Sequence, residues 1–121
     1  MLSAVAALQP DLPVLIHGYD YALPGGHAPD PRHPFYAAQD KWLGQPFARL
    51  GIHDEALQRA IVERMINHLY ARLERLAQEF PRSARIVDVR GCNPAKELWN
   101  DEVHPTDPGF SRVSARFRAS L

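Results

Sequence analysis

The chain has 121 residues, which is enough for one domain with a modest hydrophobic core. Its 14 basic and 14 acidic side chains cancel, so the sequence offers no basic surface for binding nucleic acid. A single cysteine excludes an internal disulfide and a cysteine-based zinc site, and no apolar run approaches the roughly 20 residues that cross a bilayer. Residues 1–8 lack the basic and long apolar parts of a secretory signal. The protein is therefore expected to be soluble and cytoplasmic, unless a targeting segment lies upstream of this sequence.

The first two elements expected are a short helix and a buried strand. Residues 2–8 are apolar and rich in alanine, and Pro10 and Pro13 end this helix. Residues 13–17 form a nearly continuous apolar run between a proline and a glycine. Such a run is typical of a strand that is buried on both faces of a parallel sheet.

Polar and aromatic side chains follow this strand at its carboxyl end, where His17, Tyr19 and Asp20 stand. Open α/β sheets have their binding crevices at the carboxyl ends of their strands. We therefore expect these three residues to contact a substrate. The alternative for His17 and Asp20 is a hydrogen-bonded turn beside a packed tyrosine.

Residues 22–51 are rich in proline and glycine, which predicts a long irregular segment. A loop of this length inside a compact domain is usually functional. We expect it to form a lid or wall beside the crevice, or else a plain connector. Its aromatic anchors are Phe35, Tyr36, Trp42 and Phe47.

A long helix is predicted over residues 53–80, with Asp54 placed to cap its start and Pro81 to end it. Apolar side chains recur at three- and four-residue steps, which predicts one stripe that packs on the core: Leu57, Ile61, Met65, Leu69, Leu73, Leu76 and Phe80. Met65 and Tyr70 are expected to take part in packing in and beside that stripe, not in binding a cofactor.

A second strand is predicted over residues 85–90 from its apolar side chains, Ile86, Val87 and Val89. A strand, a helix and a strand in succession form a crossover, so we expect the two strands to be parallel and the connection right-handed. Two parallel strands make a poor sheet by themselves and leave an open edge. We therefore expect further strands from a partner, from a second copy in a homo-oligomer, or from an upstream segment of a larger domain.

Asp101 and His104 are the pair in this sequence best suited to act together chemically. They stand three positions apart, and Pro105 follows the histidine. A residue before proline is pushed out of the helical region, so His104 is expected at a loop end. In a tight turn the aspartate can accept the Nδ1–H of the imidazole, which leaves Nε2 free to accept a proton.

A loop over residues 91–98 is expected to lead into the turn of Asp101 and His104, and the chain is expected to close with a helix over residues 108–119. Thr106 or Asp107 can cap this helix, and Pro108 suits its first turn.

The run Asp-x-x-His-Pro-Thr-x-x-Gly-Phe over residues 101–110 resembles the last signature block of the SGNH/GDSL hydrolases. Residues 14–21 and 85–91 are similar to the later strands of that family, so the resemblance covers nearly the whole chain. It implies an α/β fold, as the C-terminal part of a three-layer, flavodoxin-like sheet with helices on both faces. Residues 1–121 would then form a single partial domain.

The same resemblance implies hydrolysis of a small-molecule ester, acyl or O-acetyl, through a serine nucleophile and without a cofactor. His104 would be the general base and then the general acid, and Asp101 would orient it. The chain departs from the family in lacking a Gly-Asp-Ser-like block and the glycine and asparagine of an oxyanion hole. None of its serines has that setting: Ser3, Ser83, Ser111, Ser114 and Ser120. A base without a nucleophile supports at best weak chemistry, so the isolated chain is expected to be weak or inactive.

Several alternatives remain open at this point. In one alternative, the chain is a non-catalytic binding or interaction module derived from the SGNH/GDSL fold. Cys92 is a conceivable nucleophile for His104, but a small buried thiol is the simpler expectation. Asp88 is expected to pair with a neighbouring amide or arginine. No two histidines form a helical His-x-x-x-His pair, so no metal site is predicted.

Overall fold

The computed structural model describes residues 1–25 and 42–121 as a mixed α/β unit. Most of the predicted lid, residues 26–41, lies outside the described residues. The elements in chain order are α1 (Leu2–Leu8), β1 (Val14–His17), α2 (Gly44–Arg49), α3 (Glu55–Glu79), β2 (Ala84–Val87), the 3-10 helix η1 (Lys96–Leu98) and α4 (Asp107–Ala119).

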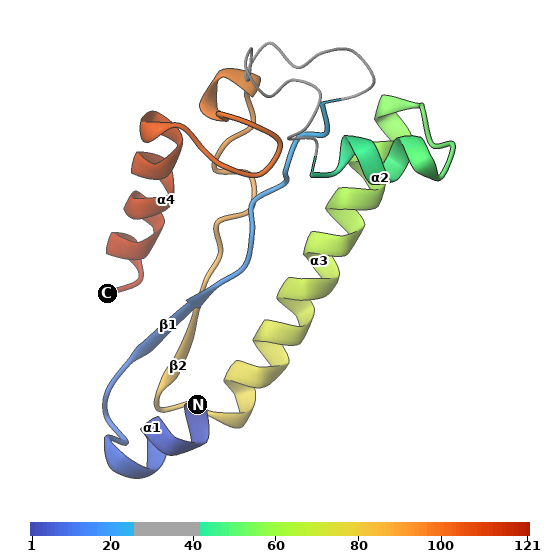
Figure 1. Ribbon diagram of the computed structural model, residues 1–121. Helices are drawn as coiled ribbons and strands as arrows, with labels where there is room; N and C mark the ends of the chain where they lie inside the picture. The colour runs from blue at the N-terminus through green and yellow to red at the C-terminus, as the bar shows by residue number, and fades with distance from the viewer. Residues whose placement is uncertain (26–41) are drawn as a thin grey trace.

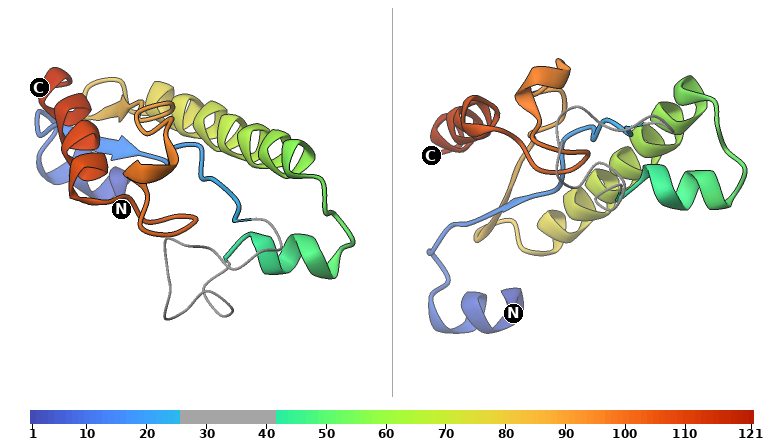
Figure 2. Two further views of the ribbon diagram at one scale, coloured as in Figure 1. Left: turned by 90° about the horizontal axis from the view of Figure 1, so that it is seen from above. Right: turned by 45° about the horizontal axis from the view of Figure 1, so that its top comes forward.

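The two strands pair in parallel, as predicted, with Val14 opposite Ala84 and His17 opposite Val87. The long helix α3 connects them, and α3 and α4 flank the strands on opposite sides (Figures 1 and 2). Side chains from both helices meet the strands in one core cluster around Val87 and Val89. The second strand is shorter than predicted, because the chain leaves the sheet after Val87.

Two predictions about helix ends are confirmed. Asp54 caps α3, and its carboxylate accepts a hydrogen bond from the Leu57 amide at 2.6 Å. Thr106 caps α4, and its hydroxyl accepts from the Gly109 amide at 3.4 Å. The prediction of an irregular segment over residues 22–51 is wrong at its end, because α2 occupies residues 44–49 and buries Phe47.

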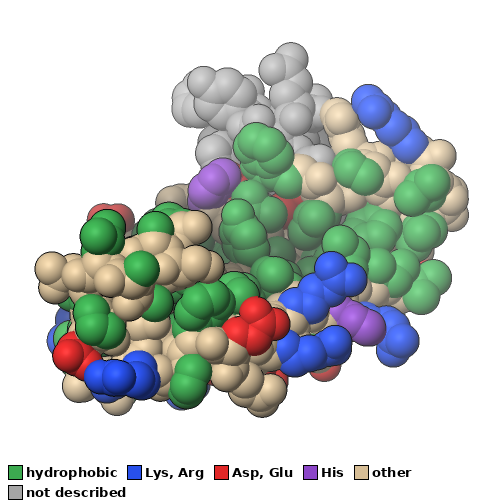
Figure 3. Space-filling model, turned by 90° about the horizontal axis from the view of Figure 1, so that it is seen from below, with side chains coloured by type: hydrophobic (Ala, Val, Ile, Leu, Met, Phe, Trp, Pro, Cys, Tyr) green, Lys and Arg blue, Asp and Glu red, His purple; other side chains and the backbone are tan. Residues whose placement is uncertain are grey.

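The predicted packing face of α3 is confirmed at Ile61, which packs against a core cluster, and is wrong at Leu57 and Met65. The helix buries Gln58, Val62 and Tyr70, whereas Leu57 is 50% exposed and Met65 is 62% exposed. The helix carries two adjacent apolar rows, and a periodicity of 3.6 residues fits either of them. Figure 3 shows one face of the molecule where apolar side chains gather beside a group of Lys and Arg side chains and a histidine.

Tyr70 separates the two strands just beyond their paired residues. Its ring is fully buried, and its hydroxyl accepts hydrogen bonds from the Gly18 amide at 3.3 Å and the Val89 amide at 3.1 Å. Burial raises the pKa of Tyr70, so the hydroxyl stays protonated at neutral pH. The side chain thereby replaces the strand-to-strand hydrogen bonds at this point and opens a space at the carboxyl ends of β1 and β2.

None of the helices in the described ranges 1–25 and 42–121 has the length and apolar character that a membrane span requires. The sheet in these ranges has two strands, and Val14, Leu15 and Ile16 of β1 are only half-buried. These apolar side chains are less buried than is usual for a strand of a parallel sheet. The sheet therefore has an open edge along β1, at which further strands could pair.

Candidate active site

The loop between Trp99 and Pro105 is closed by backbone hydrogen bonds at its base. Trp99 and Pro105 form an antiparallel bridge, the Asn100 amide donates to the His104 carbonyl at 2.8 Å, and the Thr106 amide donates to the Leu98 carbonyl at 2.9 Å. Pro105 follows His104, which lies outside any helix, as expected of a residue before proline. The loop therefore holds Asp101 and His104 at fixed positions on one short turn.

The carboxylate of Asp101 bonds to both the backbone and the imidazole of this turn. Oδ1 accepts from the amides of Val103 at 2.8 Å and His104 at 2.7 Å, and Oδ2 lies 2.7 Å from Nδ1 of His104. Burial by itself raises the pKa of Asp101, but the hydrogen bonds from Val103 and His104 outweigh it and hold the pKa below its ordinary value.

The charge on Asp101 fixes the tautomer of His104. An ionised carboxylate can only accept hydrogen bonds, so the proton between the two side chains is on Nδ1. Nε2 of the neutral imidazole is then the proton acceptor. The His104 side chain is 58% exposed, against 11% for Asp101, so the acceptor is accessible while its partner is shielded.

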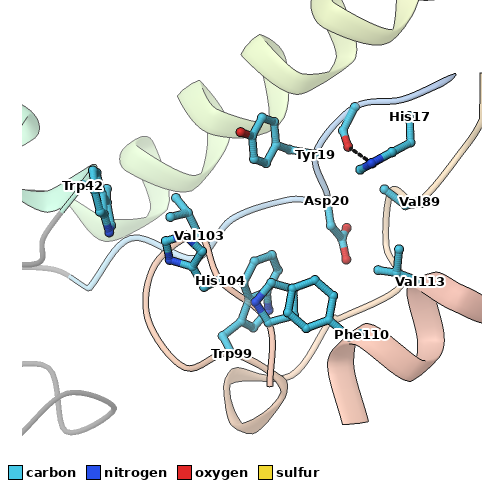
Figure 4. Close-up of a pocket in the computed structure, with 12 residues that line it drawn as sticks. His17, Tyr19, Asp20, Trp42, Val89, Trp99, Val103, His104, Phe110 and Val113 are labelled. Carbon is cyan, nitrogen blue, oxygen red and sulfur yellow. Dashed lines mark hydrogen bonds between the residues drawn. The ribbon is translucent and has the colours of Figure 1, made fainter. Parts of the chain in front are cut away.

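His104 lies beside a cavity of about 440 Å³ at the carboxyl end of β1 (Figure 4). The cavity is formed by the end of β1, the loop that holds His104, and the first turns of α4. Its lining residues are His17, Gly18, Tyr19, Asp20, Trp42, Val89, Trp99, Val103, His104, Pro105, Phe110 and Val113. Trp42 packs edge-on against His104, with ring centroids 6.0 Å apart.

The structure brings all three of the other predicted site residues to this cavity, but Asp20 has a structural role there. Asp20 is 5% exposed, and its carboxylate accepts hydrogen bonds from the amides of Tyr21, Gly91 and Asn93. It thus ties the end of β1 to the loop after β2. Its hydrogen bond to the Tyr21 amide agrees with the alternative prediction of a hydrogen-bonded turn. The hydrogen bonds from the Gly91 and Asn93 amides were not predicted.

His17 and Tyr19 present their side chains differently. Nδ1 of His17 donates to the Gly18 carbonyl at 2.7 Å, and the His17 ring packs edge-on against Phe117. Tyr19 is 63% exposed and extends along the cavity wall. Both residues are placed to contact a ligand, whereas the Asp20 carboxylate is already fully engaged by backbone amides.

Glu102 is the buried group that the sequence did not reveal. It is 1% exposed, and its carboxylate accepts hydrogen bonds from the amides of Gly25, Leu43 and Gly44. These amides come from two segments that are 58 to 77 positions away along the chain. Glu102 thereby fixes the start of α2, next to Trp42, against the loop that carries His104.

No serine lines the cavity in the described part of the chain, which includes all five serines. Ser83 is buried just before β2, and Ser111 and Ser114 lie on the exposed surface of α4. Cys92 is buried, as expected of a structural thiol, and does not line the cavity either. The cavity is thus lined by His104, which Asp101 holds by a hydrogen bond, and by no serine or cysteine of the described residues.

Outside the cavity, the predictions concerned the partner of Asp88 and metal-ligating side chains. Asp88 pairs with Arg90, as predicted: it accepts from the arginine amide and side chain, with Nη2 at 2.7 Å from Oδ2. The Arg90 side-chain hydrogen bonds hold the pKa of Asp88 below its ordinary value. Among residues 1–25 and 42–121 no group of three or more metal-ligating side chains comes together.

The chain was compared with protein-family models, curated proteins and solved structures, and nothing in the three comparisons matches it.

Proposed function

We propose that this chain supplies the general base of a hydrolytic site for a small-molecule ester, in the manner of the SGNH/GDSL hydrolases. The observation that carries the proposal is the 2.7 Å bond between Nδ1 of His104 and an ionised Asp101, beside a cavity of ligand size. The two-stranded parallel sheet with its flanking helices would be the C-terminal part of a flavodoxin-like fold.

The chemistry follows from the accessible Nε2 of His104. Nε2 takes the proton from a serine hydroxyl as the serine oxygen attacks the ester carbonyl, and Asp101 stabilises the imidazolium that forms. The imidazolium then gives the proton to the departing alkoxide. In the second half of the reaction, Nε2 activates a water that releases the acyl group.

The proposal requires a serine and oxyanion donors from outside residues 1–121. An upstream segment, or a partner such as a second copy of the chain, would supply them while pairing with an edge of the sheet. The carboxyl end of β1 opens on the cavity through Gly18 and Tyr19. A strand added in parallel beside β1 would therefore end near His104, where a nucleophile is needed.

Hydrolysis of p-nitrophenyl acetate tests the proposal, together with a fluorophosphonate label detected by mass spectrometry. The purified chain is compared with His104→Ala and Asp101→Asn, and His68→Ala on the exposed side of α3 serves as the histidine control. Turnover that is lost in both site variants but kept in the control supports the base role. If the chain alone shows only background turnover, the same test is made on the chain together with the upstream segment or partner that would supply the serine. Equal rates with and without His104 in that complete form would refute the proposal.

A non-catalytic binding module is the second candidate, and the lining of the cavity favours it in one respect. None of the five serines lines the cavity, so the described residues form a ligand site without a nucleophile. A protein whose complete form binds a ligand at this cavity, but takes no fluorophosphonate label on any serine, would belong to this class.

A further inference from the structure

A groove of about 530 Å³ runs along the exposed side of α3. Its lining residues are Ile61, Arg64, Met65, His68, Leu69 and Arg72. We call it the α3 groove, and we propose that it binds an acidic amphipathic helix of a partner protein. The proposal is independent of the hydrolytic function, because these six residues are not among those that line the cavity beside His104.

The lining residues have the spacing of a surface that receives side chains from a facing helix. Ile61, Arg64, Met65 and His68 stand at positions i, i+3, i+4 and i+7, and the same pattern starts again at Met65. Residues in this arrangement surround a hole into which one side chain of a packed helix fits. Every helix surface has such sets of residues, and this one is distinguished by an apolar floor and a cationic edge.

The floor of the α3 groove is apolar and accessible. Ile61 and Leu69 are half-buried, and Met65 between them is 62% exposed. Covering such surface favours association, and the flexible methionine side chain adapts to the shape of a partner. A bilayer would need apolar side chains that project from the surface, whereas Ile61 also packs against a core cluster. A helix that lays its own apolar side chains into the groove therefore fits this surface better than a membrane does.

Cationic side chains along one edge of the groove select the charge of the partner. Arg64, His68 and Arg72 are exposed and follow one another at four-residue steps, so they form one row on α3. No hydrogen bond or ion pair joins these three side chains to another group in the part of the chain that the structure describes. Asp or Glu side chains at four-residue steps on a partner helix would pair with this row. Such exposed pairs each add little affinity, but they discriminate against a basic partner.

Two synthetic peptides test the groove, each about 18 residues long so that a helix can form. The acidic peptide has leucine at three- and four-residue steps, glutamate on both flanks and alanine elsewhere, and the basic peptide has lysine in place of every glutamate. Each carries an uncharged fluorophore, and fluorescence anisotropy measures its binding to the full chain. The acidic peptide is expected to bind at least about tenfold more tightly than the basic one, and its binding should weaken as salt is added.

Charge reversal in the groove gives the sharpest variant. Arg64→Glu combined with Arg72→Glu should reverse the preference, and a gain of affinity for the basic peptide also shows that the variant is folded. Arg59→Glu, at an exposed position of α3 outside the groove, should leave the preference unchanged. Met65→Ala should lower the affinity for the acidic peptide about tenfold, whereas Leu8→Ala, on the exposed surface of α1, should not change it.

Equal affinity for the two peptides, or a preference for the acidic peptide that survives charge reversal, would overturn the inference. Binding to vesicles of phosphatidylserine and phosphatidylcholine, without binding of the acidic peptide, would also overturn it and assign the surface to a membrane. These outcomes do not depend on His104, so they leave the test of the hydrolytic function unaffected.

Discussion

The carboxylate of Glu102 accepts a hydrogen bond from the backbone amide of Leu43 at 2.6 Å, across 59 positions of sequence. Glu102 belongs to the turn that holds His104, and Leu43 directly follows Trp42, whose ring packs on His104. This one buried group therefore sets the position of Trp42 against the candidate base. A carboxylate suits the position because its partners among the described residues are N–H donors, and an ionised carboxylate has only acceptors to offer.

Glu102→Gln should destabilise the fold and loosen the contact of Trp42. The amide replaces one acceptor oxygen with a donor that faces backbone N–H groups, and a buried donor left unpaired costs about 1–3 kcal/mol. Urea denaturation measures the loss of stability, and proton NMR of the contact between the Trp42 and His104 rings measures the loosening. Glu97→Gln, at an exposed position of η1, is the matched control and should change neither. Equal stability of the two variants would contradict the role given to Glu102.

Gly109→Ala tests why glycine stands in the first turn of α4. A Cβ atom there would collide with the Leu98 carbonyl oxygen and come within 2.8 Å of the Pro105 side chain. Helix propensity alone favours alanine by about 1 kcal/mol, whereas overpacking costs about 1–3 kcal/mol. We expect net destabilisation in a thermal or urea melt, since the collision is with backbone. Ser114→Ala, at an exposed position on the same helix, should be neutral or slightly stabilising. A stabilised Gly109→Ala variant would show that α4 can shift away from η1 freely.

Tyr70→Phe should lower the free energy of unfolding by about 1–3 kcal/mol, because it leaves the buried amides of Gly18 and Val89 without their acceptor. Hydrogen exchange of these two amides is the direct measurement, and both should exchange faster in the variant. Tyr19→Phe removes a hydroxyl from a side chain that is 63% exposed, so its stability should match the parent protein. Unchanged exchange at Gly18 and Val89 would mean that the strands can close over the missing hydroxyl.

The stability of the protein should fall in acid partly through Asp101. Its pKa is lower in the folded protein than its ordinary value of 3.8, so ionised Asp101 stabilises the fold above that value. This contribution is lost as the pH falls below 3.8 and through the lowered pKa of the folded state. Urea midpoints measured from pH 7 to pH 3 should therefore drop less steeply in Asp101→Asn. Asp88 also has a lowered pKa, so some acid dependence remains in the variant. Curves of equal slope would count against a stabilising charge at Asp101.

The parts of the site that depend on local sequence could be read from the sequence alone. Asp101 and His104 are three positions apart in a turn ended by proline, so their hydrogen bond needs only local geometry. The caps of α3 and α4 at Asp54 and Thr106 were predictable for the same reason, since a cap bonds within its own first turn. The parallel pairing of β1 and β2 followed from the strand–helix–strand order.

Tertiary structure decided the rest, because it depends on contacts between distant residues. The choice between the two apolar rows of α3 was made by Tyr70 inserting between the strand ends, which no periodicity encodes. The sequence allowed two interpretations of Asp20, a substrate contact or a local turn. The structure decides between them, because the carboxylate accepts hydrogen bonds from the amides of Gly91 and Asn93, 71 and 73 positions away. Glu102 gave no signal at all, since its partners are amides that every residue type except proline carries. The sequence by itself determined the chemical pair, and only the folded chain determined which side chains surround it.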